Sequence, residues 1–120
     1  MKNDLQRILN IVSEYYGISE NIIKSNNRRK DVAKVRHVYF YIAYLTSDKT
    51  YSEVGKFVFR DHSTVLHGHN KIKGEVNLYP DIYFEVLELK EKCKPKINIA
   101  IENIDLLQMC INYTNSSIRI

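Results

Sequence analysis

Residues 60–67, which read Arg-Asp-His-Ser-Thr-Val-Leu-His, constrain the fold of this chain more than any other part of its sequence. Asp61 can cap a helix, because its carboxylate accepts hydrogen bonds from the free N–H groups of the turn that follows. Apolar residues then recur at helical spacing, at Val65, Leu66, Ile72 and Val76. The stretch therefore predicts a helix with one buried face and an exposed polar tip formed by His62, Ser63 and Thr64.

A shorter helix is expected just before this stretch. Ser52 is its expected N-cap, and Val58 and Phe59 then carry the chain through a tight turn to Arg60. A short helix, a tight turn and a longer helix with an exposed tip are typical of a helix-turn-helix. Because the tip is rich in hydrogen-bonding groups, we expect it to read base edges in the major groove of double-stranded DNA.

Further helical patterns make the expected fold class all-α, a small helical bundle that contains the helix-turn-helix. An opening helix should run from about Asp4 to Tyr16, with Asn3 as its cap and Gly17 as its stop. Ser19 should cap a short apolar turn, and Asp31 should cap a central helix. The expected buried positions of that central helix are Val32, Val35, Tyr39, Ile42 and Leu45.

The sequence divides into an expected domain at residues 1–95 and a C-terminal extension at residues 96–120. The last helix of the domain should begin near Pro80, close at Pro95 and bury Ile82, Val86, Leu89 and Cys93. The structure of the extension stays open, because Ile97, Ile99 and Ile101 alternate as in a strand, whereas Ile101, Ile104, Leu107 and Ile111 have helical spacing. So many apolar residues should either fold back on the bundle or form a homodimer with a second copy.

Positive charge is concentrated in one part of the chain. The net charge is +4, and the basic residues crowd one short stretch, opposed only by Asp31: Lys24, Arg28, Arg29, Lys30, Lys34 and Arg36. A local positive field favours a polyanion, and nucleic acid is the usual one. The alternative is an ordinary solvated basic face. No membrane segment or signal peptide is evident, so a cytoplasmic, nucleoid-associated location is expected.

From about Asp4 to Cys93, the chain resembles the C-terminal DNA-binding domain of the bacterial chromosomal replication initiator DnaA. Three stretches carry the resemblance: residues 14–18 (Glu-Tyr-Tyr-Gly-Ile), residues 28–37 (Arg-Arg-Lys-Asp-Val-Ala-Lys-Val-Arg-His) and residues 60–67 followed by Lys71-Ile72. The third is the most specific, because its order and spacing form a family signature. The resemblance implies an all-helical domain that reads a short double-stranded DNA box.

The resemblance also implies which residues contact DNA. Asp61, His62, Ser63 and Thr64 match the positions that read bases in the major groove, and Arg28 matches an arginine that enters the adjacent minor groove. The remaining expected contacts are Arg29, Lys34, Arg36, His37, Arg60 and Lys71. The chemistry agrees, because Asp can accept from the cytosine amine, and arginine gains from the negative potential of a narrow minor groove.

The chain departs from the family pattern in four respects. Val58-Phe59 replaces the usual Gly-Gly, so the turn should be rebuilt, since glycine permits turns that Val and Phe resist. Ser63 stands where threonine is common, and Tyr44 stands where a basic residue is frequent. No Gly-x-x-x-x-Gly-Lys-Ser/Thr loop is present to bind nucleotide phosphates. We therefore expect a stand-alone reader, such as a regulator or a mobile-element replication factor.

Rival interpretations rest on the histidines and tyrosines. His62, His67 and His69 lack the spacing of metal ligands on one helix face, and consecutive Asp61-His62-Ser63 cannot align as a hydrolase triad, so neither a metal, a cofactor nor catalysis is expected. His67 should instead be partly buried. Tyr41 and Tyr44 leave open a protein-interaction adaptor, which would bind the replication initiator or other replication proteins without reading DNA.

Overall fold

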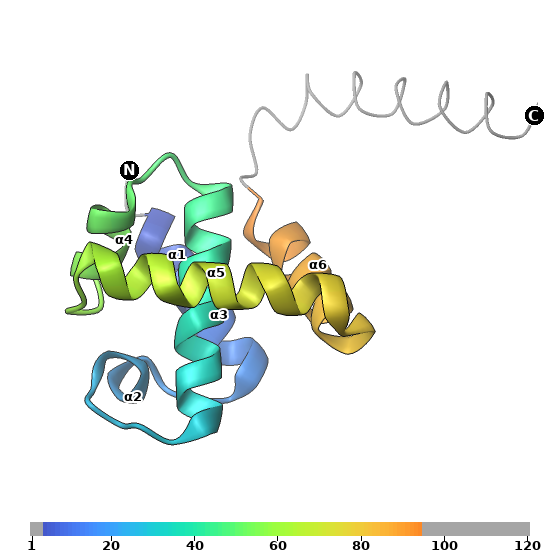
Figure 1. The fold of residues 1–120 in the computed structure, drawn as a ribbon. Helices are drawn as coiled ribbons and strands as arrows, with labels where there is room; N and C mark the ends of the chain where they lie inside the picture. The colour runs from blue at the N-terminus through green and yellow to red at the C-terminus, as the bar shows by residue number, and fades with distance from the viewer. Residues whose placement is uncertain (1–3, 95–120) are drawn as a thin grey trace, which may run out of the picture.

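The computed structural model describes residues 4–94, and six α-helices form this part of the chain (Figure 1). They are α1 (Asp4–Tyr16), α2 (Glu20–Lys24), α3 (Lys30–Thr46), α4 (Tyr51–Lys56), α5 (His62–Leu78) and α6 (Pro80–Cys93). The prediction of an all-α bundle with a helix-turn-helix is confirmed, and the opening helix has the predicted bounds. The predicted Asn3 cap, the Pro95 stop and the extension at residues 96–120 lie outside the described residues.

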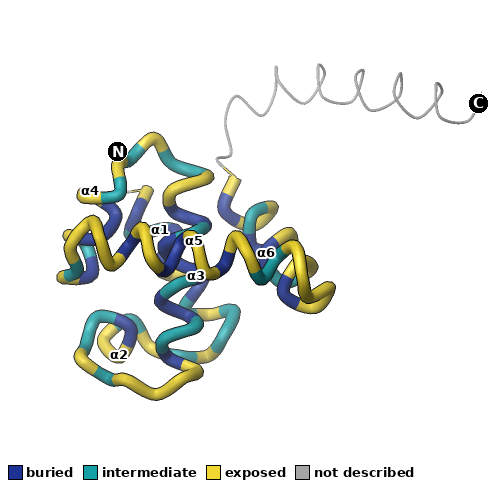
Figure 2. The backbone as a smooth tube through the Cα atoms, viewed as in Figure 1, coloured by how far each residue is buried: buried dark blue, intermediate teal, exposed yellow. Residues whose placement is uncertain are grey.

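Helix α3 is the centre of the bundle, and α5 crosses it (Figure 1). Buried positions concentrate where these two helices meet (Figure 2). Four of the five predicted core positions of α3 are buried, whereas Leu45 remains 44% exposed. The prediction for Leu45 is wrong because the last turn of α3 extends past α5, where less of the bundle covers it (Figure 1).

The crossing of α3 and α5 depends on Gly68. A Cβ atom at Gly68 would lie only 2.6 Å from Cδ2 of His37 and 2.8 Å from Cδ2 of Phe40. Glycine therefore permits an approach of the two helices that alanine would obstruct. On the same face of α5, Val65 and Ile72 are buried as predicted. The prediction for Leu66 is wrong, because its side chain is 39% exposed beside that face. The crossing sets the orientation of α5, and so of its polar tip.

Side-chain caps begin three of the helices, α2, α4 and α5, and two of the predicted caps need correction. Ser19 caps α2 by accepting from the Ile22 N–H, as predicted. Thr50, not Ser52, caps α4, because Thr50 and Glu53 bond each other's backbone N–H in a reciprocal capping box. Helix α3 begins at Lys30, so Asp31 falls in its first turn instead of capping it. Both errors displaced a helix start by two residues, and both helices exist as predicted.

Helix α6 closes the bundle against α1, α3 and α5. It begins at Pro80, whose missing N–H costs nothing in a first helical turn. All four predicted inner residues are buried: Ile82, Val86, Leu89 and Cys93. Its flank is fixed by Tyr16, whose hydroxyl donates to Glu85 over 2.9 Å, and by Tyr15, which donates to Glu88 over 3.2 Å.

Candidate nucleic-acid interface

The N-terminus of α5 forms an exposed polar tip, as predicted. Asp61 caps the helix, with its Oδ1 accepting from the Thr64 N–H over 2.9 Å. This hydrogen bond lowers the pKa of the Asp61 carboxyl, so the group stays ionised at neutral pH. His62, Ser63 and Thr64 are all exposed beside it. The tip thus combines a fixed carboxylate, two hydroxyls and an imidazole with the electropositive end of a 17-residue helix.

The turn between α4 and α5 takes an unusual backbone conformation. Phe59 has a φ of 63°, in the left-handed region that favours glycine, and its side chain is 74% exposed. Val58, by contrast, is buried. The chain therefore makes a glycine-like turn without glycine, with strain at Phe59 and an anchor at Val58. We expected Val58-Phe59 to rebuild this turn, and the structure instead shows Phe59 in a backbone conformation that glycine adopts more easily.

Close packing within the helix-turn-helix relies on Gly55. The Arg60 N–H donates to the Gly55 carbonyl over 2.8 Å, which closes the turn. A Cβ atom at Gly55 would lie 2.6 Å from the Arg60 carbonyl oxygen and 2.7 Å from Cγ2 of Val65. Helix α4 therefore rests directly on the start of α5, so the turn and the tip are held as one unit.

Two arginines join the basic loop between α2 and α3 to the helix-turn-helix. We call them the arginine brace, which consists of Arg36 and Arg60 together with the backbone carbonyl of Ser25. Arg36 Nη2 donates to that carbonyl over 3.2 Å, and Arg60 Nη2 donates to it over 2.6 Å. Arg36 also donates to the carbonyls of Ile23, at 2.9 Å, and Asn27, at 3.2 Å. The brace thus fixes the loop against the start of α5.

The brace gives Arg36 and Arg60 a structural role that the sequence did not reveal. Arg36 is only 8% exposed, and burial, with Arg60 nearby, lowers the pKa of its guanidinium. Arg60 is half-buried and also donates to the Val58 carbonyl over 2.9 Å. Both guanidinium groups are therefore engaged with backbone oxygens near the surface expected to meet DNA.

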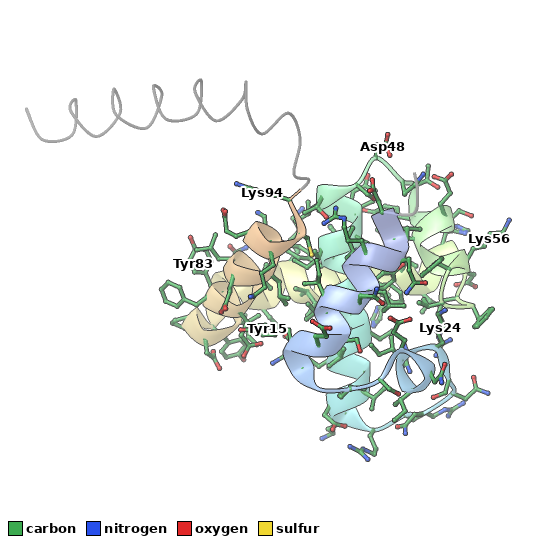
Figure 3. All side chains as sticks on the ribbon, turned by 180° about the vertical axis from the view of Figure 1, so that it is seen from behind. Tyr15, Lys24, Asp48, Lys56, Tyr83 and Lys94 are labelled. Atoms are coloured by element: carbon green, nitrogen blue, oxygen red, sulfur yellow. The ribbon has the colours of Figure 1, made fainter. Side chains whose placement is uncertain are left out.

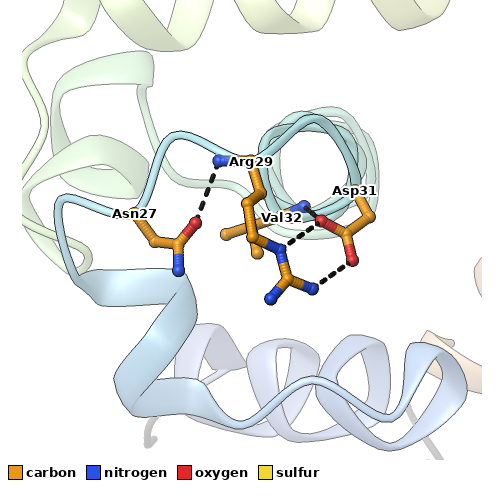
Figure 4. Close-up of polar contacts among 4 residues, drawn as sticks. All are labelled: Asn27, Arg29, Asp31 and Val32. Atoms are coloured by element: carbon orange, nitrogen blue, oxygen red, sulfur yellow. Dashed lines mark hydrogen bonds and ion pairs between the residues drawn. The ribbon is translucent and has the colours of Figure 1, made fainter.

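The loop ahead of α3 presents Arg28 and Arg29 differently. Both are exposed, but Arg29 pairs with Asp31 at 2.7 Å, and its backbone N–H donates to Oδ1 of Asn27 over 2.9 Å (Figure 4). Asp31 in turn accepts from the Val32 N–H. These hydrogen bonds fix the backbone on both sides of Arg29. Arg28 is exposed on the same loop, which the arginine brace also holds.

The other predicted contact residues lie along the junction of α3 with α5. A hollow is lined there by Lys30, Ala33, Lys34, His37, Lys71, Ile72 and Glu75. Lys34 pairs with Glu85 at 3.1 Å, and Lys71 pairs with Glu75 at 3.5 Å, so each cation has an acidic neighbour. Lys71 is exposed, while Lys34 and His37 are half-buried.

The histidines occupy distinct environments. Burial, followed by the nearby His67 and Lys71, lowers the pKa of His37, and burial also lowers the pKa of His69. Both are therefore neutral at pH 7. The expectation of a partly buried His67 is wrong: it is exposed, with its ring edge toward His37, because it lies on the outward side of α5. His69 is the buried one and packs beside Tyr41, Tyr44 and Tyr51.

Tyr44 stacks on Tyr51, with ring centroids 4.0 Å apart and planes inclined by 14°. This places a pair of aromatic rings at the junction of α3 and α4.

Within residues 4–94, no group of three or more His, Cys, Asp or Glu residues is arranged to hold a metal ion. None of the helices described is long and apolar enough to cross a membrane.

Together, the braced turn, the exposed tip of α5 and the basic loop define the class: a helix-turn-helix DNA-binding domain. The chain belongs to the family described as bacterial dnaA protein helix-turn-helix, whose match covers residues 5–72. It is 37% identical over 84 residues to the chromosomal replication initiator protein DnaA of Streptococcus agalactiae serotype Ia (strain A909), covering 69% of this chain and 18% of the relative.

Other relatives show the same partial coverage. The DnaA protein of Streptococcus equi subsp. zooepidemicus (strain MGCS10565) is 36% identical over 84 residues, or 69% of this chain and 19% of the relative. That of Streptococcus pyogenes serotype M4 (strain MGAS10750) is 33% identical over 91 residues, or 75% of this chain and 20% of the relative. The chain therefore spans about a fifth of the length of these relatives, and the shared part is the helix-turn-helix domain.

Proposed function

We propose that this protein reads a short double-stranded DNA box in a sequence-specific manner, with the tip of α5 in the major groove. The observation that carries the proposal is the tip itself, where Asp61, His62, Ser63 and Thr64 are exposed on a capped and braced helix. A helix end of this kind can enter the major groove, where each base pair shows its own pattern of donors and acceptors.

Three of the four tip residues have a defined chemical partner on DNA. Asp61 uses Oδ1 for its cap, which leaves Oδ2 to accept from a cytosine amine. Ser63 and Thr64 can donate or accept, and the Thr64 methyl can lie against a thymine methyl. The N-terminus of α5 also suits a phosphate oxygen. A good bidentate base contact contributes about 1–3 kcal/mol of discrimination against the wrong base.

The loop ahead of α3 supplies the second contact. Arg28 is assigned to the adjacent minor groove, where a narrow A·T-rich segment attracts arginine. Arg29, Lys34, His37 and Lys71 are assigned to contacts with the DNA backbone, which add affinity without reading sequence. The buried Arg36 and half-buried Arg60 act on DNA chiefly by positioning the loop relative to the tip, because several of their donors are already engaged with backbone carbonyls.

The biological role that fits is control of replication or transcription at boxes resembling those of the initiator. The relatives are named chromosomal replication initiator proteins, and this chain shares their DNA-reading part. A regulator that competes for initiator boxes, or a replication factor of a mobile element, would need no more than this domain. Such a protein would act in the cytoplasm, on the nucleoid.

Selection of bound duplexes from a random pool, followed by anisotropy titration against a scrambled duplex, tests the proposal. His62→Ala and Thr64→Ala should lower affinity for the selected box by about tenfold or more, while scarcely changing affinity for the scrambled duplex. Arg28→Ala should weaken binding most to boxes with an A·T-rich flank. Glu14→Gln, at an exposed position of α1, is a control that should leave affinity for the box near the wild-type value.

Equal affinities for the selected and scrambled duplexes would refute sequence-specific reading. The adaptor hypothesis makes a different prediction: changes at the tip would leave binding of a replication protein intact, while Tyr44→Ala would abolish it. The stacked Tyr44–Tyr51 pair is the feature that supports this second candidate. Binding of purified initiator with no binding to any selected duplex would favour it.

A further inference from the structure

Helix α6 carries a second apolar face that the bundle does not cover. This outer stripe consists of Pro80, Tyr83, Phe84 and Leu87, and all four residues are exposed. Phe84 is 63% exposed, and Tyr83 points away from the bundle (Figure 3). A single exposed apolar residue needs no explanation, but a contiguous stripe at helical spacing is typical of an interaction surface.

The outer stripe does not belong to the DNA-reading surface. It lies beyond the C-terminal end of α5, whereas the polar tip is at the N-terminal end of that helix (Figure 1). Seventeen helical residues separate the two ends by about 25 Å at 1.5 Å per residue. The inner face of α6 already packs on the bundle, and its flank is bonded to α1 through Tyr15 and Tyr16. An apolar surface of this kind is also unsuited to a polyanion.

We propose that the outer stripe is the docking site for this chain's own residues 97–111. The extension follows α6 directly in the sequence. The C-cap of α6 is Lys94, whose backbone is extended (φ −61°, ψ 140°), as the residue before a proline usually is. Two helices joined by a loop of two to five residues commonly form an antiparallel hairpin. The short connection at residues 94–96 therefore suits a segment that returns along the helix it has just left.

The spacing of apolar residues matches on the two sides. Along α6, stripe positions are separated by four residues and then three, at Pro80, Phe84 and Leu87. In the extension, the reverse order holds, with steps of three and then four at Ile104, Leu107 and Ile111. An antiparallel arrangement sets these positions opposite each other in turn: Leu87 with Ile104, Phe84 with Leu107, and Pro80 with Ile111.

The tether favours this segment over a second copy. A short linker holds the segment near its site at an effective concentration in the millimolar range, far above that of a second copy in dilute solution. Of the two conformations that the extension's sequence allows, the helical one places its apolar residues on the side facing α6. The extension would then complete the bundle as a seventh helix, at the end remote from DNA.

Paramagnetic relaxation in the full chain tests the proposal. Cys93→Ala leaves Cys110 as the one thiol, and a spin label attached there should broaden the amide signals of residues 79–84 far more than those of α4. Phe84→Asp, in the same labelled chain, should abolish that broadening. Lys92→Gln, an equal change of charge at another exposed position of α6, should leave it unchanged.

A mixing experiment shows whether the segment on the outer stripe belongs to the same chain or to a second copy. A spin-labelled chain without isotope, mixed with an isotope-labelled chain without spin label, should give no broadening. Broadening in that mixture would show that a second copy occupies the stripe, and would overturn the proposal, as would absence of localised broadening in the single chain. Circular dichroism checks that Phe84→Asp is folded. Its affinity for the selected DNA duplex should equal that of the wild type, so this test does not depend on the DNA-binding proposal.

Discussion

Replacing Arg36 by methionine separates two roles that this arginine could have. As a phosphate contact, Arg36 would add affinity and salt dependence but little stability. As part of the arginine brace, it holds the carbonyls of Ile23, Ser25 and Asn27 at 2.9–3.2 Å. We expect the brace role to dominate, because the residue is only 8% exposed and methionine keeps much of its length without its donors.

The expected loss of stability follows from those contacts. A hydrogen bond from a charged donor contributes about 1.5–3 kcal/mol, and carbonyls left unpaired in a buried place add a desolvation cost. Relief of the desolvation and of the repulsion from Arg60, the two causes that lower the pKa of Arg36, offsets part of the loss. A net destabilisation of about 2 kcal/mol remains, or a fall in melting temperature of roughly 10 °C for a domain of this size.

Urea denaturation and salt-dependent DNA binding measure the two effects. Lys56→Met, at an exposed position of α4, removes the same charge and should change the free energy of unfolding by less than about 0.5 kcal/mol. If Arg36 were only a phosphate contact, Arg36→Met would reduce the magnitude of the slope of log K against log salt by about one. Its urea midpoint would then equal that of Lys56→Met. That result would refute the brace.

Three further changes test the fold. Phe59→Gly should raise the free energy of unfolding, measured by urea denaturation, by about 0.5 kcal/mol, because it relieves a left-handed backbone at an exposed site; an unchanged or lower free energy would contradict this. Gly68→Ala should destabilise the α3–α5 crossing by about 1–3 kcal/mol, as measured by thermal melting, and a neutral effect would count against the close approach. Burial lowers the pKa of His37 and His69, so the unfolded chain binds more protons than the folded one between pH 7 and 5. The free energy of unfolding should therefore fall as the pH drops from 7 to 5. Changing both histidines to glutamine should make the free energy of unfolding depend less on pH over this range.

The elements that the sequence predicts best are those decided by local chemistry. Asp61 and Ser19 cap their helices because each has a free N–H within three residues. Local chemistry also explains one of the two capping errors, since Thr50 caps α4 in place of Ser52 by forming a reciprocal box with Glu53. Choosing among several polar candidates at a helix start requires the backbone path, which single residues do not specify.

Contacts that depend on tertiary structure escaped prediction. In the sequence, Arg36 belongs to a basic run and so suggests a DNA contact. Its partners lie 9–13 residues earlier in the chain, across a loop whose path is set by the packing of α2 on α3. Likewise, the missing glycines led us to expect a rebuilt turn, whereas Phe59 itself takes the left-handed conformation that glycine adopts more easily.

The arginine brace also explains how the interface keeps its charge while becoming rigid. An arginine held by a carboxylate loses most of its field at a distance, as Arg29 does beside Asp31 at 2.7 Å. Arg36 and Arg60 instead donate to the neutral carbonyl of Ser25, so their hydrogen bonds are satisfied while both positive charges remain. Within residues 4–94 neither arginine has an ion-pair partner, so two positive charges beside the tip of α5 raise the local positive potential. If the proposed interface is correct, the groups that fix the loop also attract phosphates to the surface that we propose reads DNA.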